Sequence, residues 1–381
     1  MKTTMRLALW GLIFLFTIFA AGCGGRGAPG SDLPQPGGEP PGMLPPFFED
    51  ARFREDMRIA EMRGVGGIAL VAPSSGLTNR GADKVRLMAE TLGLALSAEA
   101  FGGSVPYNAN EDDIRLRLLA KALADPDVAI IWPVVGGYGS SRLLEGLAAI
   151  APGVSPGVSP GELPGKTSGK TSGKTSGKKL LVGYSDTTFL HLYFQKMGWR
   201  TVHGPLFWEL GSTRKDPENA YRLAALFAGR VSELRYGGLA PCNAAARAVA
   251  KPVRGVVTGG NLTCLAAAGG TPWALEAAGK ILFLEDVKEP GYKIDRMLTQ
   301  LQTSGALDGV KAVILGTFTA GDQFTEYALE RFAASCGVPV FRSDLFGHGE
   351  KNYPLVFNAP AKVEKGVGDT FTLVIDARSI P

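Results

Sequence analysis

Apolar runs alternate with segments of helical periodicity along the first half of the chain. Three runs have the length and composition of buried strands, at 68–73, 128–135 and 180–183. Helical patterns follow them at about 84–96, 112–124 and 187–197. This alternation predicts a doubly wound parallel sheet, whose ligand site lies beyond the carboxyl ends of the strands.

The pattern changes after a helical segment near residues 217–229. Further strands are expected at 255–258, 281–284 and 310–315, and an amphipathic helix carries Ile294, Met297, Leu298 and Leu301. A chain of 381 residues is long enough for two cores. We therefore predict an α/β protein with an N-terminal doubly wound domain over 64–235 and a C-terminal mixed α/β domain over 236–381, with the active site at their interface.

Tandem low complexity interrupts the first domain at 152–179. Two copies of Gly-Val-Ser-Pro begin at Gly153, and three copies of Gly-Lys-Thr-Ser begin at Gly165. This composition predicts a disordered surface insertion. The Gly-Lys-Thr triplets resemble a phosphate-binding loop, but the required earlier glycine and the preceding strand are missing, so we do not expect nucleotide binding.

The first 23 residues have the pattern of a lipoprotein-type signal peptide. Lys2 and Arg6 precede an apolar run at 7–19, which is too short for a comfortable membrane span of ~20 residues. Small residues then lead into Cys23, the expected lipidation site; the alternative is an ordinary cleaved signal peptide. Residues 24–63 are expected to form a Gly/Pro-rich tether. We therefore expect an exported protein, anchored to a membrane and facing the periplasm or the cell exterior.

Net charge and cysteine content limit the partners and cofactors that we expect. The net charge of +4 is small, and the excess lies in the leader and the repeat, so a nucleic-acid partner is not expected. Cys242, Cys264 and Cys336 are widely spaced, which favours free thiols with one disulfide left open. The sequence offers no metal cluster, and no metal or cofactor is expected. A homodimer stays open.

A serine follows the third apolar run, in Gly183-Tyr184-Ser185-Asp186. Such a strand-to-helix turn exposes the hydroxyl and directs backbone N–H groups outward, as acyl-transfer enzymes require. Thr187 stands where the full hydrolase elbow has a second glycine. The alternative is a structural turn with a serine or aspartate cap.

A serine nucleophile needs a base and an orienting carboxylate. The histidines are His191, in an apolar helical segment, His203, in a turn, and His348, between two glycines. The glycines leave His348 room to approach another domain, so it is the favoured base. Glu285 ends an apolar strand, where a buried acid needs a partner, so it is the favoured carboxylate.

Short motifs resemble, in order, those of the LD-carboxypeptidases, or muramoyl-tetrapeptide carboxypeptidases, from about Gly66 to Val363. They are Val71-Ala72-Pro73-Ser74, Gly136-Gly137-Tyr138-Gly139 with Arg142-Leu143-Leu144, Gly183-Tyr184-Ser185-Asp186, His203-Gly204-Pro205, Gly259-Gly260-Asn261-Leu262 with Gly270-Thr271, Leu284-Glu285-Asp286, Asp295-Arg296 and Gly347-His348-Gly349.

The resemblance implies a catalytic triad of Ser185, His348 and Glu285, with an oxyanion hole formed by the N–H groups of Gly137 and Asp186. It further implies release of the terminal D-alanine from murein tetrapeptides, without a metal. Three residues in the shared motifs are candidates for substrate binding: Tyr138, Asn261 and Arg296.

Two features depart from the family pattern. Val135 stands where the family usually has an arginine, and losing this cation would weaken or redirect recognition of a substrate carboxylate unless Arg142 or Arg296 compensates. The leader is the other, because many relatives act in the cytoplasm. Two alternatives therefore stay open: a microcin-immunity-type hydrolase of peptide-nucleotide antibiotics, and a non-catalytic lipoprotein that binds the cell wall.

Overall fold

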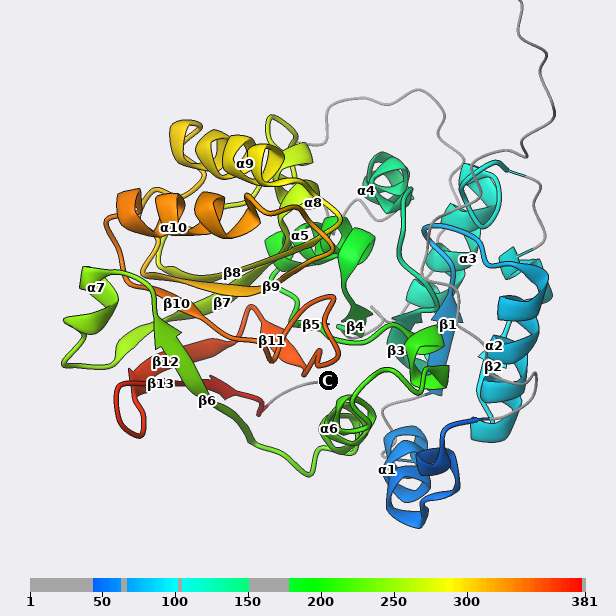
Figure 1. Cartoon of the computed structure of the whole chain (residues 1–381). Coiled ribbons are helices and arrows are strands. Elements are labelled where there is room, and N and C mark those ends of the chain that lie inside the picture. Colours follow the sequence, from blue (N-terminus) through cyan, green and yellow to red (C-terminus); the bar gives the residue numbers. More distant parts are fainter. Residues whose placement is uncertain (1–43, 63–66, 102–104, 151–177, 379–381) are drawn as a thin grey trace, which may run out of the picture.

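The computed structural model describes residues 44–62, 67–101, 105–150 and 178–378 (Figure 1). The expected signal peptide with Cys23, the tether up to residue 43 and the repeat at 151–177 lie outside the described residues. Figure 1 shows two bodies side by side, one built around β1, β3 and β4 and the other around β6 to β10 with β12 and β13.

The first body is a six-stranded sheet in the order β11-β5-β4-β3-β1-β2. All its neighbouring strands run parallel except β11, which pairs with β5 in the antiparallel sense. The strands are β1 (Gly67–Val71), β2 (Ala95–Leu96), β3 (Val128–Pro133), β4 (Leu180–Gly183), β5 (Thr201–His203) and β11 (Leu355–Phe357). The predicted parallel sheet is therefore confirmed, with one antiparallel edge strand.

Helices cover both faces of this sheet, because successive residues of each strand face opposite cores. Ile130 and Trp132 of β3 pack in one core with residues of the helices α1, α2 and α6, whereas Ile131 packs in the other with residues of α3, α4 and α5. The helices are α1 (Ala51–Met62), α2 (Asn79–Leu92), α3 (Asp112–Ala124), α4 (Leu144–Ile150), α5 (Thr188–Lys196) and α6 (Glu218–Phe227).

The second body is a closed barrel in the order β10-β6-β13-β12-β7-β8-β9. Its strands are β6 (Glu233–Pro241), β7 (Val253–Asn261), β8 (Lys280–Val287), β9 (Ala312–Thr319), β10 (Val340–Arg342), β12 (Pro360–Lys365) and β13 (Phe371–Asp376). The run from β7 through β8 and β9 to β10 is parallel, and the remaining pairs are antiparallel. This barrel is the expected mixed α/β domain.

Four helices belong to the barrel: α7 (Ala244–Arg247), α8 (Leu262–Ala267), α9 (Gly291–Thr303) and α10 (Thr325–Ser335). Ile294, Leu298 and Leu301 of α9 are buried, as its amphipathic pattern predicts. In Figure 1, α9 and α10 lie together over β8 and β9. They shield the apolar parallel strands from solvent on this side of the barrel.

The structure corrects two of the expected boundaries. The tether expected to reach residue 63 ends earlier, because η1 (Pro46–Glu49) and α1 are folded and bury Phe48 and Phe53 in the core. The Gly/Pro-rich composition ends before these aromatic residues, which supply the apolar area that folding needs. The expected boundary at 235/236 falls inside β6, and β11 returns from the C-terminal half to the first sheet.

The described residues add three further facts. No helix among them is long and apolar enough to cross a membrane. They contain no group of three or more His, Cys, Asp or Glu side chains that could hold a metal ion. Cys242, Cys264 and Cys336 are free thiols.

Candidate active site

Ser185 occupies a sharp turn between β4 and α5. Its φ of 61° is left-handed, a conformation that costs a non-glycine residue ~1–2 kcal/mol, and a short helix η5 (Ser185–Thr187) begins at this residue. The next residues in the chain, Asp186 and Thr187, are buried, so packing in the protein interior fixes the turn. Strain of this kind is tolerated where the surroundings fix it, and here it directs the serine outward as the sequence predicts.

A glycine turn after β3 lies directly against Ser185. A Cβ atom at Gly136 would be 3.2 Å from Ser185 Oγ, so a side chain here would crowd the serine. Gly137 has a φ of 96°, and a Cβ there would collide with the side chain of Ser75. Ser75 fixes the turn, because its N–H donates to the Gly136 carbonyl (3.0 Å) and its Oγ accepts from Tyr138 N–H (3.1 Å).

The N–H groups proposed for the oxyanion hole border this turn. Among the described residues, neither Gly137 N–H nor Asp186 N–H has a hydrogen-bond acceptor. The Asp186 carboxylate is buried and accepts from Ser74 Oγ (2.6 Å) and Ser140 N–H (2.8 Å), while Ser140 Oγ donates to the Asp186 carbonyl (2.6 Å). The Asp186 side chain therefore joins the loops after β1 and β3 to the serine turn and leaves its own N–H available.

His348 and Glu285 form a tight pair on the barrel side. His348 Nδ1 donates to Glu285 Oε2 at 2.5 Å, and the carboxylate, near the end of β8, is fully buried. Gly347 has a φ of 111°, and a Cβ there would lie 3.1 Å from Glu285 Oε2. The loop is also anchored by Gly347 N–H to Asn352 Oδ1 (3.0 Å) and Gly349 N–H to Thr317 Oγ1 (3.2 Å).

Ser185 and His348 line one cleft of about 550 Å³ between the two bodies. Its walls come from loops that follow β3, β4 and β5 of the sheet and β8, β9 and β10 of the barrel. The carboxyl ends of both sets of parallel strands therefore meet at this cleft, where ligand sites are expected. The lining also includes Gly137, Trp208, Arg214, Lys215, Lys288 and Glu350.

The three candidate substrate-binding residues do not line this cleft. Asn261 is buried, caps α8 and donates to Asp286 Oδ1 (2.9 Å). The Arg296 guanidinium lies over the ring of Tyr292, and Tyr138 packs its exposed ring against Tyr107. The three residues belong to the shared sequence motifs, but their side chains contact other residues instead of lining the cleft.

The remaining positions of interest also lie away from the cleft. Val135 is uncharged and fully buried. Arg142 pairs with Asp112 (2.6 Å) outside the cleft, so it supplies no charge there either. His191 contacts the Gly183 carbonyl (2.8 Å), and burial lowers its pKa to about 4. Burial also holds the pKa of His203 well below its usual value, next to Asn352 Oδ1 at 3.1 Å.

Sequence reasoning missed a buried polar group beneath the imidazole, formed by Tyr184, Glu209 and Lys215. The Tyr184 ring lies 4.5 Å from that of His348, and its hydroxyl donates to Glu209 Oε1 (2.7 Å). Lys215 Nζ lies 2.9 Å from Glu209 Oε1 and donates to the carbonyl of Gly349 (2.8 Å). The residue beside the serine is thus linked to the residue beside the histidine, across the two bodies.

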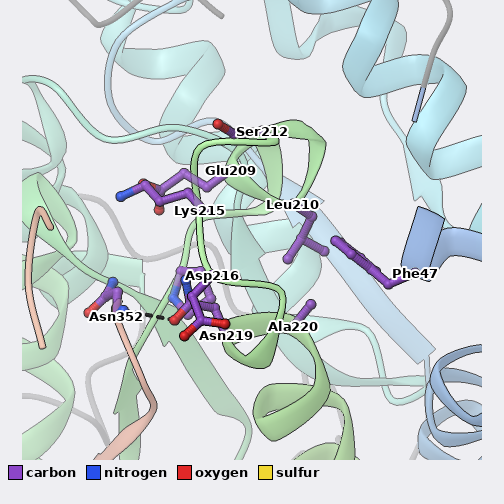
Figure 2. Close-up of a pocket in the computed structure, with 10 residues that line it drawn as sticks. Phe47, Glu209, Leu210, Ser212, Lys215, Asp216, Asn219, Ala220 and Asn352 are labelled. Atoms are coloured by element: carbon purple, nitrogen blue, oxygen red, sulfur yellow. Dashed lines mark hydrogen bonds and ion pairs between the residues drawn. The ribbon is translucent and has the colours of Figure 1, made fainter. Parts of the chain in front are cut away.

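Electrostatics agree with an ionised Glu209. Burial favours the neutral acid, but the Lys215 ammonium and hydrogen bonds from Tyr184 and Leu206 N–H outweigh it and lower the pKa of Glu209. Figure 2 shows Glu209 and Lys215 side by side above a small cavity that Asn219 and Asn352 also line. That cavity has a volume of about 10 Å³, roughly enough for one water molecule, so it is no substrate site.

Comparison with known proteins identifies the family of the chain. The LD-carboxypeptidase N-terminal domain profile matches residues 68–204, and the C-terminal domain profile matches residues 254–363. A Rickettsia conorii protein, whose carboxypeptidase assignment is provisional, is 34% identical over 300 residues, 78% of this chain and 88% of its own. The murein tetrapeptide carboxypeptidase of Pseudomonas aeruginosa is 31% identical over 317 residues, 78% of this chain and 93% of its own.

A solved structure agrees. The muramoyltetrapeptide carboxypeptidase from Oxalobacter formigenes superposes with a TM-score of 0.65 at 25% identity, covering 81% of this chain and 98% of its own. The chain therefore belongs to the LD-carboxypeptidase family, a family of serine-type hydrolases. Both domains of the family are present, the parallel-sheet domain and the barrel.

Proposed function

We propose that this protein hydrolyses the L,D amide bond of murein tetrapeptides and releases the terminal D-alanine. One observation carries the proposal: His348, paired with Glu285 at 2.5 Å, lines the same cleft as Ser185, and two N–H groups beside Ser185 have no acceptor among the described residues. The name of the Pseudomonas relative, a murein tetrapeptide carboxypeptidase, supports the choice of substrate.

In the proposed mechanism, Ser185 Oγ attacks the amide carbonyl while His348 Nε2 takes its proton. Glu285 accepts from Nδ1, which keeps the proton off Nε2 in the resting state and stabilises the imidazolium that forms. The N–H groups of Gly137 and Asp186 stabilise the negative oxygen of the tetrahedral intermediate. The imidazolium then protonates the leaving amine, and water hydrolyses the acyl-enzyme by the same steps.

The site of action is part of the proposal. The basic and apolar leader ending at Cys23 supports export and a lipid anchor, and so places the enzyme next to intact wall or shed peptides. Labelling with a radioactive fatty acid in cells, with Cys23→Ala as the control, tests the anchor. Label on the Cys23→Ala variant would contradict it.

Mass spectrometry of murein tetrapeptide tests the activity, using residues 44–381 and the same protein with Ser185→Ala. We expect loss of one D-alanine with the wild type only. Cleavage by both would refute Ser185 as the nucleophile. Binding without cleavage by either would favour the wall-binding alternative.

Trp208 favours a test of the microcin-immunity alternative, because this residue lines the cleft and offers an aromatic surface for a nucleobase. A peptide-nucleotide conjugate is therefore included in the same assay. Faster turnover of the conjugate than of the tetrapeptide would favour the microcin-immunity type of activity.

A further inference from the structure

Three cationic side chains line the cleft within the described part of the chain: Arg214, Lys215 and Lys288. They differ in what already surrounds them. Lys215 forms an ion pair with Glu209 Oε1 (2.9 Å) and donates to the Gly349 carbonyl (2.8 Å). Lys288 also has an interaction partner. The guanidinium of Arg214 has no ion pair or side-chain hydrogen bond to any residue that the structure describes.

The loop that carries Arg214 is fixed rather than loose. Arg214 N–H donates to Ser212 Oγ (3.3 Å), and two residues later Asp216 is held from the barrel side. Its N–H donates to the Glu350 carbonyl (3.1 Å), and its carboxylate accepts from Tyr353 Oη (2.8 Å). The backbone of this loop is therefore held by both bodies, which places Arg214 at a fixed position along the cleft.

The positions that the sequence analysis considered for carboxylate recognition supply no cation to the cleft. Position 135 holds a buried valine, Arg142 is paired with Asp112, and Arg296 lies over Tyr292 outside the cleft.

We propose that Arg214 binds the terminal carboxylate of the peptide substrate and so restricts the enzyme to cleavage of the last residue. This inference rests on the proposed carboxypeptidase function. A guanidinium binds a carboxylate through two parallel N–H···O bonds, which fixes orientation as well as position. The carboxylate stays ionised throughout the reaction, so the contact is equally strong in the ground and transition states and acts on KM rather than on kcat.

The test compares murein tetrapeptide with its C-terminal amide, using wild type and Arg214→Gln. For the free acid, Arg214→Gln should raise KM about 10-fold with little change in kcat, in keeping with one charge-assisted contact in a solvated cleft. For the amide, both proteins should share the same high KM. Arg214→Lys should recover part of the affinity for the acid.

Arg254→Gln is the matched control, because it removes an exposed arginine outside the cleft. An equal loss with acid and amide, or an acid-to-amide ratio unchanged in Arg214→Gln, would overturn the proposal while leaving the carboxypeptidase function intact. Calorimetric binding of acid and amide to Ser185→Ala, with and without Arg214→Gln, gives the same comparison without turnover. It therefore still decides the matter if the wild type cleaves neither peptide.

Discussion

Replacing Glu285 with glutamine should separate activity from stability. The Glu285 carboxylate is fully buried, yet its Oε1 has no hydrogen-bond partner in the described part of the chain. Its charge also acts on Asp286, whose pKa is raised from 3.8 to about 6 by burial first and by Glu285 second. A shift of that size corresponds to about 3 kcal/mol, to which burial contributes most and the charge of Glu285 next.

The sign follows from proton binding. Because the pKa of Asp286 is higher in the folded than in the unfolded protein, the folded state binds more protons between pH 4 and 6. Asp286 therefore lowers stability as the pH rises through this window, and Glu285→Gln should make that decrease smaller. At pH 7.5 the variant regains the part of this cost that is due to the charge of Glu285. It loses roughly 1–3 kcal/mol where the amide nitrogen replaces Oε1 without an acceptor.

The rate should respond very differently. An amide at position 285 no longer stabilises the imidazolium and permits the wrong tautomer of His348, a change that typically lowers kcat by about 10⁴ in triad enzymes. We therefore expect loss of turnover together with a shift in unfolding free energy of about 2 kcal/mol or less. Initial rates by mass spectrometry and urea unfolding at pH 5 and 7.5 measure both quantities.

Asp286→Asn is the control, since it makes the same chemical change one residue away without touching His348. Asparagine keeps only one acceptor oxygen, so either Asn261 or Thr263 loses its acceptor, and the change should cost stability while kcat changes by less than about 10-fold. Our reasoning is refuted if Glu285→Gln keeps more than a tenth of the wild-type kcat. It also fails if Asp286→Asn loses as much rate as Glu285→Gln.

Two further variants test the surroundings of the triad. Gly137→Ala forces a Cβ onto Ser75 at a φ of 96°, so kcat should fall about 100-fold. The control Gly238→Ala, at a φ of 80° with open space around it, should keep the wild-type kcat. Equal kcat values for the two variants would remove Gly137 from the oxyanion hole. Tyr184→Phe keeps the ring on His348 but removes the hydroxyl from Glu209, so thermal and urea unfolding should show a loss of about 1 kcal/mol; unchanged stability would mean that this bond is not structural.

Local patterns predicted much of the fold and the positions of the candidate triad. The strands near β1, β3, β4 and β8 were predictable because a buried strand needs a continuous apolar run. Ser185 and Glu285 were identifiable because each follows or ends such a run, and both parallel sheets place strand ends at one edge. Gly347 and Gly349 pointed to His348, and the structure gives the reason at Gly347, where a Cβ would crowd Glu285.

The return of β11 to the first sheet, the closure of the barrel and the packing of α1 were not predictable in this way. Each depends on pairing or packing between segments far apart in sequence, which periodicity within one segment does not record. The same holds for Asn261 and Arg296, whose motif positions suggested substrate contact although their side chains bind other partners.

The sequence by itself thus determined the strands near β1, β3, β4, β7, β8 and β9 and the chemically active residues that follow their apolar runs. Tertiary structure alone decided which of them meet, because the cleft forms only when the sheet and the barrel pack together. Glu209 illustrates the limit: its buried pair with Lys215 joins Tyr184 to Gly349 across the two bodies. Arg214 gains its proposed role in the same way, from a cleft in which the other described cations already have partners.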